Sequence, residues 1–462
     1  MRITTRVRAV ALAAAALTVT ASLSACGAGG GGSGGSGGKH SITVLMVNNP
    51  QMLELQALTA ENFTKQTGIN VKFVTKVEQD MRDTASTEFA NQTGQYDVAT
   101  LSNFEIPYYA KAGWLDDMQS IAEDKTFDQA DILPSMTAAL TYPTTGGKLY
   151  GEPFYGESSF LMYRKDIFAK DGLTMPAEPT WNQVATLADQ VKTKNAGMAG
   201  ICLRGLAGWG DNLAPLTTIA NTFGGTWFDE NWQAQVNTGG FKKAANFYVD
   251  LIKKDGEAGA STFSFPQCLA AVQGSKAAMW YDATSAAGPL EASNSPVKGK
   301  MGYVSAPHDM TPQTGWLYTW AWAIEKASKH ADDAKKFVQW ASSKDYENLV
   351  ATTTTGPFAG ASNVPAGKRT STYSNATYLK VAGVFAVPTL KAIKAAPSAN
   401  PGVQKRPYTG IQFVGIPSFT DFGLTCAKAI SSAIAGSTST DSALNECQKV
   451  AQAAGTEASK AK

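Results

Sequence analysis

The chain has 462 residues, a formal net charge of +2 and charged side chains at only 17% of its positions. It carries no basic stripe or arginine-rich run, so a nucleic-acid partner is not expected. Beyond the N-terminus, no uncharged apolar run approaches the ~20 residues that a membrane-spanning helix needs. The length is sufficient for two lobes, each with a sizeable core.

The first 39 residues read as export and anchoring signals. Residues 1–25 combine an arginine-containing start with a long uncharged stretch, which is typical of a signal peptide. They run into the sequence LSAC, which resembles a bacterial lipobox and makes Cys26 the expected lipidated residue. Cys26 and a Gly/Ser linker fill 26–39, a flexible spacer of roughly 20 Å. We expect a protein tethered by lipid to the extracellular face of the bacterial cell membrane; a plain secretory signal is the alternative.

Four further cysteines, an even number, suggest two disulfides in an exported protein. Cys426 and Cys447 bracket a short segment and are the favoured pair, which leaves Cys202 with Cys268. The pairing itself stays open, and free buried thiols are the alternative. A metal site is not expected, because the sequence has no CxxC motif and its three histidines are isolated.

The first part of the mature chain alternates strands and helices. Strands are predicted at 42–47, 70–75 and 96–101, with helices at 51–67 and 78–93 between them. This βαβαβ rhythm predicts an α/β fold with a parallel sheet covered by helices. Ligands of such sheets lie beyond the carboxyl ends of the strands, so the loops at 48–52 and 102–109 are candidate binding segments.

The remainder of the chain continues the α/β pattern. Extended chain leads into a helix across 146–168, and an amphipathic helix is predicted near 330–343 from apolar residues at i, i+3, i+4 and i+7. The tail over 370–455 is helical, with a break at 406–417. The other predicted elements are helices at 181–196, within 207–225 and at 241–254, strands at 199–205 and 277–282, and extended chain at 299–309.

Several long blocks resemble extracellular solute-binding proteins of the maltose-binding type, which serve ABC importers. The similarity covers nearly all of 40–450, and it is greatest to the sorbitol/mannitol (polyol) binding branch. It is carried by YGEPFYGESSFLMYRKDIF, GICLRGLAGWGDN, NTFGGTWFDENWQ, MWYDATSAAG, GWLYTWAWAIEKASKHADDAKKFVQWASSKDY and YTGIQFVGIP. The resemblance implies a two-lobe periplasmic-binding-protein-like fold with an interlobe cleft and a hinge. Chain crossings are expected near 150–154, near 304–308 and after the 330–350 helices. The N-lobe would comprise 40–152 and 307–356, and the C-lobe 153–306 and 357–462.

The resemblance also implies what the protein does. A monomer would capture a polyol or sugar and deliver it to the membrane permease subunits and ATPase of an ABC importer, using no cofactor and no metal. A di- or oligosaccharide ligand is the alternative within the family. The stereochemistry of the ligand, its affinity and an additional role as a sensor subunit stay open.

A polyol presents a row of hydroxyls and apolar C–H faces, so its site needs paired polar groups and aromatic rings. Arg204 ends a strand and offers five fixed donors, although a surface ion pair is the alternative. Asp282 ends the next strand and is either a ligand contact or the N-cap of a helix at 284–292. Glu157 follows a lobe crossing, where it either meets the ligand or makes a structural hydrogen bond. The remaining candidates outside residues 315–322 are Asn48, Asn49 (one of the two facing the cleft), Glu105, Tyr155, Trp209, Asp211 and Gln412.

Residues 315–322, GWLYTWAW, place four aromatic side chains at alternate positions, and a strand would point all four to one face. We expect Trp316 and Trp320 to wall the pocket, with Trp320 the stronger candidate, and Trp322 to pack in the core. Tyr318 is undecided. Such a division requires a bend or bulge near Gly315, or a pocket that reaches along the strand.

An enzyme is the alternative class. A secreted glycosidase needs two carboxylates flanking one bond, and Glu157 with Asp282 is the pair to consider. No Ser/His/Asp set or metal cluster is evident in the sequence, so binding without catalysis is predicted.

Overall fold

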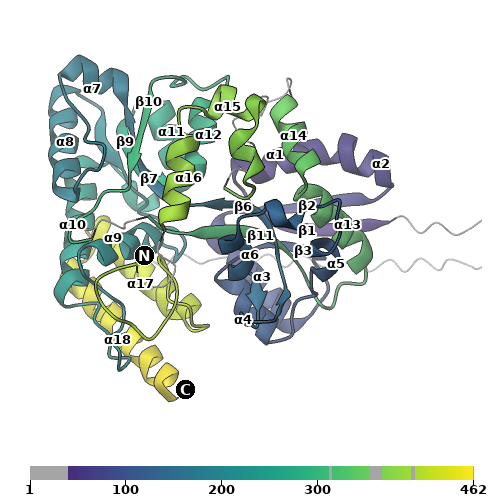
Figure 1. Cartoon of the computed structure of the whole chain (residues 1–462). Coiled ribbons are helices and arrows are strands. Elements are labelled where there is room, and N and C mark those ends of the chain that lie inside the picture. The colour runs from purple at the N-terminus through teal and green to yellow at the C-terminus, as the bar shows by residue number, and fades with distance from the viewer. Residues whose placement is uncertain (1–39, 312–314, 354–363, 365–366, 397–400, 461–462) are drawn as a thin grey trace, which may run out of the picture. The chain divides into compact units, whose positions relative to one another are not determined.

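The computed structural model describes residues 40–311, 315–353, 364, 367–396 and 401–460. The predicted signal peptide, Cys26 and the linker lie outside the described residues. Within the described part, the strands form a five-stranded sheet, a four-stranded sheet and a small two-stranded one. The α/β two-lobe prediction is therefore confirmed at the level of the fold, since each larger sheet has its own set of helices (Figure 1).

The first sheet has the order β2-β1-β3-β11-β6. Its N-terminal strands are parallel, as predicted, because each is linked to the next by a helix. The fourth strand runs antiparallel to both of its neighbours and returns from a distant part of the chain. The strands are β1 Ser41–Val47, β2 Asn70–Lys76, β3 Val98–Ser102, β6 Glu152–Glu157 and β11 Tyr318–Ile324.

Helices around this sheet begin and end at recognisable signals. The predicted helix at 51–67 is observed as three consecutive segments and stops at Gly68, whose φ of +75° suits glycine. Phe337 of α13 packs on the core through Phe63 and Trp322. The segments are α1 Pro50–Thr59, a π-helical turn Ala60–Thr64, α2 Lys65–Thr67, α3 Glu78–Asn91, α4 Glu105–Lys111, α5 Gln119–Ala122, α6 Pro134–Ala139, α13 Ala331–Ala341 and α14 Lys344–Thr352.

The second sheet has the order β10-β7-β9-β8 and mixes parallel and antiparallel pairs. A capping box formed by Thr180 and Gln183 begins α8, because their side chains satisfy backbone N–H groups that the first turn leaves free. The strands are β7 Ser159–Arg164, β8 Ala199–Cys202, β9 Ala277–Ala283 and β10 Met301–Ser305. The helices are α7 Lys165–Asp171, α8 Trp181–Lys194, α9 Leu213–Thr222, α10 Gly239–Asp255, α11 Phe265–Gln273 and α12 Ala287–Glu291.

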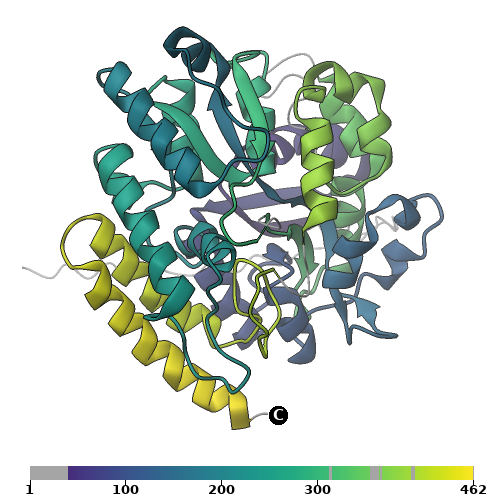
Figure 2. The same cartoon turned by 60° about the vertical axis from the view of Figure 1, so that its left-hand side comes forward.

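The C-terminal part is helical, with the predicted break around 406–417. Two long helices, α17 Phe419–Ile434 and α18 Thr440–Lys460, lie side by side (yellow in Figure 2). They are preceded by α15 Ala376–Ala382 and α16 Ala386–Ala395. In the described part of the chain no single helix meets the length and apolarity of a membrane span; α15 and α16 together do so by length and composition, with a 95° bend between them.

The chain passes between the two larger sheets at Ser158, which separates β6 from β7, and again between β10 and β11. The first passage lies a few residues after the predicted crossing at 150–154. The small sheet, β4 Thr141–Tyr142 with β5 Lys148–Leu149, comes shortly before it. These passages are the connections on which a hinge would act, and the lobe limits given above stay a prediction.

The structure contains one of the two predicted disulfides and contradicts the other. Cys202 and Cys268 form a disulfide with their Cα atoms 5.6 Å apart, joining β8 to α11. Cys426 and Cys447, the favoured pair, are instead free buried thiols on α17 and α18. Nearness in sequence therefore misled us, because two packed helices hold small apolar side chains such as thiols without a covalent bond.

Glu54 on α1 is a buried carboxyl group, 1% exposed, and neither of its oxygens has a hydrogen-bond partner among the described residues. Burial raises its pKa from 4.5 to about 9. The folded state thus keeps a proton that the unfolded state releases. The stability from this proton is complete below about pH 4.5 and is lost as the pH rises towards 9.

We therefore expect Glu54→Gln to raise the free energy of unfolding at pH 7 by up to about 3 kcal/mol. Glutamine has no proton to release, so the free energy of unfolding of the variant should also fall less between pH 5 and pH 8.5. Urea unfolding at several pH values measures both effects. Glu61→Gln, at an exposed position two residues after the end of α1, is the control and should leave the pH profile unchanged. Equal pH profiles for Glu54→Gln and the unmodified protein would contradict the prediction.

Candidate functional site

A cavity of about 210 Å³ lies where the ends of the two larger sheets meet. Its walls come from the loop after β1, the start of α3, the end of β6, the loop after β8 and the segment that leads into β11. Several of these wall segments begin where a buried strand ends at polar residues, as expected for a ligand site in an α/β fold. The lining includes Asn48, Asn49, Gln51, Glu78, Gln79, Arg82, Tyr155, Glu157, Arg204, Trp209, Asp211, Ser264, Phe265, Ser285, Trp316, Tyr318, Trp320 and Gln412.

Every predicted ligand residue except Glu105 and Asp282 lies on this wall. The structure thus brings together side chains that the sequence spreads from Asn48 to Gln412. Whether each contacts a ligand remains a prediction. Asn49 also has a local role, because its Oδ1 accepts the N–H of Met52 and caps α1 while its Nδ2 donates to the Tyr155 hydroxyl at 3.0 Å.

Asp282 lies behind the wall and holds Arg204 in place. Its carboxylate, 1% exposed, accepts two hydrogen bonds from the guanidinium of Arg204, at 2.8 Å from Nε and 2.6 Å from the terminal nitrogen. The Trp280 indole also donates to it. Burial by itself would lower the pKa of Arg204, but the nearby carboxylates, Asp282 first and then Glu78 and Asp211, together outweigh that effect and raise it. The helix-cap reading of Asp282 is wrong: Ala283 precedes the short 3-10 turn Thr284–Ala286, and Ala286 precedes α12.

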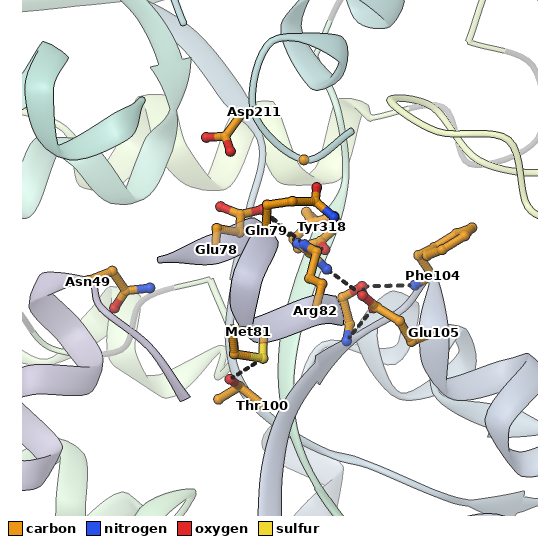
Figure 3. A network of polar contacts seen from close by, with 12 residues as sticks. Asn49, Glu78, Gln79, Met81, Arg82, Thr100, Phe104, Glu105, Asp211 and Tyr318 are labelled. Atoms are coloured by element: carbon orange, nitrogen blue, oxygen red, sulfur yellow. Dashed lines mark hydrogen bonds and ion pairs between the residues drawn. The ribbon is translucent and has the colours of Figure 1, made fainter. Parts of the chain in front are cut away.

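Glu105 is likewise turned away from the cavity and bound to an arginine that our sequence analysis missed. Arg82 is 4% exposed, and its guanidinium donates to Glu105, to Glu78 at 2.7 Å and to the Tyr318 hydroxyl at 2.5 Å (Figure 3). In the sequence, Glu78 and Arg82 form an ordinary i, i+4 pair on a helix, a pattern that usually marks a solvated face. Only the approach of β11 and the β8–α9 loop makes this end of α3 part of the site.

Arg82 is also enclosed by aromatic rings. Its Cζ lies 4.1 Å from the ring centroid of Trp209 and 4.7 Å from that of Trp320. Such stacking favours a guanidinium and orients the two indoles at the same time. Both tryptophans were predicted for the wall, but their partnership with a cation was not.

Glu78 joins the two arginines of the site. One of its oxygens accepts hydrogen bonds from Arg82, and the other lies 3.8 Å from a terminal nitrogen of Arg204. Arg82 belongs to α3 beside the first sheet, and Arg204 follows β8 of the second. Two more contacts connect these parts, Gln51 Nε2 with the Ser285 carbonyl at 3.3 Å and Phe104 with Trp209 at a centroid distance of 4.7 Å.

Two carboxyl groups of the wall have perturbed acidity. Burial, moderated by the Ser285 hydroxyl that donates to it at 2.5 Å, raises the pKa of Glu157 to about 8. Burial, together with the charge of Glu78, raises the pKa of Asp211 to about 7, although the Ser264 hydroxyl at 2.5 Å partly offsets it. Both groups can therefore act as donors or acceptors near neutral pH.

The stretch 315–322 divides between the cavity and the core along its length, which is the second of the two arrangements predicted for it. Trp316, Tyr318 and Trp320 line the cavity, whereas Trp322 is fully buried and packs on Phe154 with centroids 5.0 Å apart. Strand β11 begins only at Tyr318. Its register with β6 shifts between Trp320 and Ala321, because Phe154 stands between their partners Tyr155 and Pro153. The irregularity is therefore opposite Trp320, not near Gly315.

Three polar atoms of the wall are unused by the described part of the protein. The Trp316 indole N–H, Gln79 Oε1 and Gln412 Oε1 are buried without a hydrogen-bond partner there. One is a donor and two are acceptors, which suits a hydroxyl-bearing molecule. In the described residues no group of three or more His, Cys, Asp or Glu side chains is arranged to hold a metal ion.

Comparisons with known proteins agree with this geometry. The family model described as bacterial extracellular solute-binding protein matches residues 48–348. A mannitol-binding protein of Pseudomonas aeruginosa is 40% identical over 414 residues, covering 89% of this chain and 92% of the relative. A solute-binding protein of an ABC transporter from Agrobacterium vitis S4, solved with bound D-mannitol, is 42% identical with a TM-score of 0.86, covering 91% of this chain and 99% of that one. A ribitol complex from Agrobacterium radiobacter K84, 22% identical with a TM-score of 0.77 over 89% of this chain and 98% of that one, shares the fold.

Proposed function

The chain belongs to the family of bacterial extracellular solute-binding proteins, and on this premise we propose that it captures a polyol of the mannitol or sorbitol type for an ABC importer. The ligand would lie in the cavity between the two larger sheets. Trp209, Trp316 and Trp320 would cover its C–H faces, and the polar groups of the wall would pair with its hydroxyls. The observation that carries the proposal is the combination of this wall with its three unused polar atoms, Gln79 Oε1, Trp316 Nε1 and Gln412 Oε1.

The proposed mechanism is closure of the lobes around the ligand. A ligand that touches both lobes stabilises the closed arrangement by its differential affinity for it. Support comes from the wall itself, to which Glu78 and Arg82 contribute from one side and Arg204 and Asp211 from the other. The lobes would be 40–152 with 307–356 and 153–306 with 357–462, and the closed monomer would dock on the permease subunits.

The cellular placement follows from the same proposal. After removal of residues 1–25, lipidation of Cys26 would anchor the protein outside the cell membrane, and the linker up to residue 39 would let it reach the permease. Support is the lipobox-like LSAC at the predicted cleavage point. The role is that of a binding protein without catalysis.

Titration calorimetry with D-mannitol, D-sorbitol and maltose tests the ligand class. Binding of a hexitol and a matching rise in thermal midpoint are expected, because a ligand that binds only the folded state stabilises it by RT ln(1 + [L]/Kd). A clear response to maltose with none to any polyol would reject the polyol assignment and favour the di- or oligosaccharide alternative. Trp320→Ala, which removes an aromatic ring from the wall, is the loss-of-binding variant.

Chromogenic glycosides test the glycosidase alternative. No turnover is expected, since Glu157 and Asp282 do not form a pair facing the cavity: Asp282 lies behind the wall, bound to Arg204 and Trp280. Turnover that disappears in Glu157→Gln would overturn the binding-protein proposal.

A further inference from the structure

The charges around the cavity are unevenly distributed. Two guanidiniums, of Arg82 and Arg204, face three carboxylates that bind them directly, Glu78, Glu105 and Asp282. Asp211 and Glu157 add two more carboxyl groups on the wall. No lysine or histidine occurs among the described lining residues, and the internal segments outside the described range contain no charged residue in the sequence.

Neither arginine is available to neutralise an anion. The guanidinium of Arg204 is held in two-point contact by Asp282 and donates to the Gly210 carbonyl at 3.0 Å. That of Arg82 is occupied by Glu78, Glu105 and Tyr318 at its edge and covered by indole rings on its faces. A phosphate or carboxylate is bound well when it meets an unpaired guanidinium fork, and here both forks are taken.

We propose that the cavity selects its ligands by charge, rejecting polyols that carry a phosphate or carboxylate and accepting polyols that carry an ammonium group alongside neutral ones. The inference rests on the proposed function and extends it to a ligand class, the amino-polyols. An anion would be buried beside Asp211 and Glu157 without a free cation, which is strongly unfavourable. An ammonium group would instead find these carboxyl groups as acceptors.

Glu157 is the carboxyl group on which this selection should depend most. It lines the cavity, is 6% exposed, and its only described hydrogen bond is from the Ser285 hydroxyl. It has no arginine in direct contact, unlike Glu78, so its carboxyl group is available to a ligand. Its burial disfavours ionisation when no cation is present, and an adjacent ammonium group would reverse that preference.

Calorimetry at pH 7 on the full chain, with four ligands of one carbon skeleton, provides the test. The ligands are D-mannitol, 1-amino-1-deoxy-D-mannitol, D-mannitol 1-phosphate and D-mannonate. We expect the amine to bind within about tenfold of mannitol and both anions to bind at least about 100-fold more weakly. Either anion binding within tenfold of mannitol, or an amine as weak as the anions, would overturn the charge selection. Failure of mannitol and every other neutral polyol to bind would instead refute the proposed function.

Variants locate the selection in Glu157. Glu157→Gln should lower the ratio of amine to mannitol affinity by about tenfold. The ratio of mannitol to mannonate affinity should change little, because burial already disfavours ionisation of Glu157 when no cation is near it. If Glu157→Gln folds poorly, Asp211→Asn tests the same dependence at the second carboxyl group of the wall. Glu152→Gln is the matched control: Glu152 is a buried carboxyl on the same strand β6, with its pKa also raised by burial to about 8, but it lies away from the cavity. Affinity ratios that change equally in Glu152→Gln and Glu157→Gln would contradict the assignment.

Discussion

Replacing Trp322 by alanine should lower the free energy of unfolding by about 3–5 kcal/mol. The affinity of the folded protein for a polyol should stay nearly unchanged. Its ring is fully buried and contacts Phe154 and Phe337, which join β6 and α13 to the centre of the first sheet. The deletion would leave a cavity that these rings cannot fill, since they are themselves fixed by neighbours. Urea unfolding measures the loss.

Trp320→Ala is the matched variant two residues earlier on the same strand. Trp320 lines the ligand cavity and stacks on Arg82, so its loss should weaken polyol binding by about 30-fold or more. The effect on unfolding should be clearly smaller than that of Trp322→Ala. If both variants lose stability and affinity in the same proportion, the division of β11 into a ligand-facing and a core part is wrong.

Replacing Asp282 by alanine should cost about 3–5 kcal/mol of stability, because it leaves the Arg204 guanidinium buried without its counter-charge. The two-point contact, the Trp280 indole and the Ala283 N–H all lose their acceptor in this variant. Binding of mannitol should weaken as well, since Arg204 would no longer be held at the cavity wall. Urea unfolding and calorimetry measure the two effects.

Two further variants test whether the loss of stability in Asp282→Ala comes from the unpaired buried charge or from lost packing. Asp189→Ala removes a half-exposed carboxylate that pairs with Lys254 on the surface, and it should cost about 0–1 kcal/mol. The double variant Asp282→Ala, Arg204→Met should be more stable than Asp282→Ala alone, because the unpaired charge is gone. A double variant less stable than either single one would show that packing, not charge, dominates at this position.

Much of the candidate wall could be named from residues at strand ends. Asn48 and Asn49 follow β1 and Arg204 follows β8, so the rule that α/β ligands lie beyond strand termini was sufficient to find them. Glu157 was found instead from its place after a lobe crossing, which the family resemblance implied. The rule could not tell a residue that faces the cavity from one that supports it. Asp282 and Glu105 satisfy it too, and both are instead bound to arginines behind the wall.

Arg82 and Glu78 show the opposite limitation. On the helix that follows β2 they read as a solvated i, i+4 pair, and nothing in their spacing points to a ligand site. Burial of Arg82 arises only because Tyr318 and Trp320 of β11 and Trp209 of a distant loop close over it. The cysteines illustrate the same point, since the pair separated by 66 residues is bonded and the nearer pair is not.

Local chemistry was enough to predict the elements. Short apolar runs predicted β1, β2 and β3, Gly68 predicted the end of its helix, and helical spacing predicted α13. These features depend on residues within a few positions of one another. Which arginine meets which carboxylate, which cysteines bond and which tryptophan of GWLYTWAW faces the cavity depend on chain segments up to more than 200 residues apart. Such contacts are set by packing in three dimensions, and spacing along the chain does not encode them in a form that can be read locally.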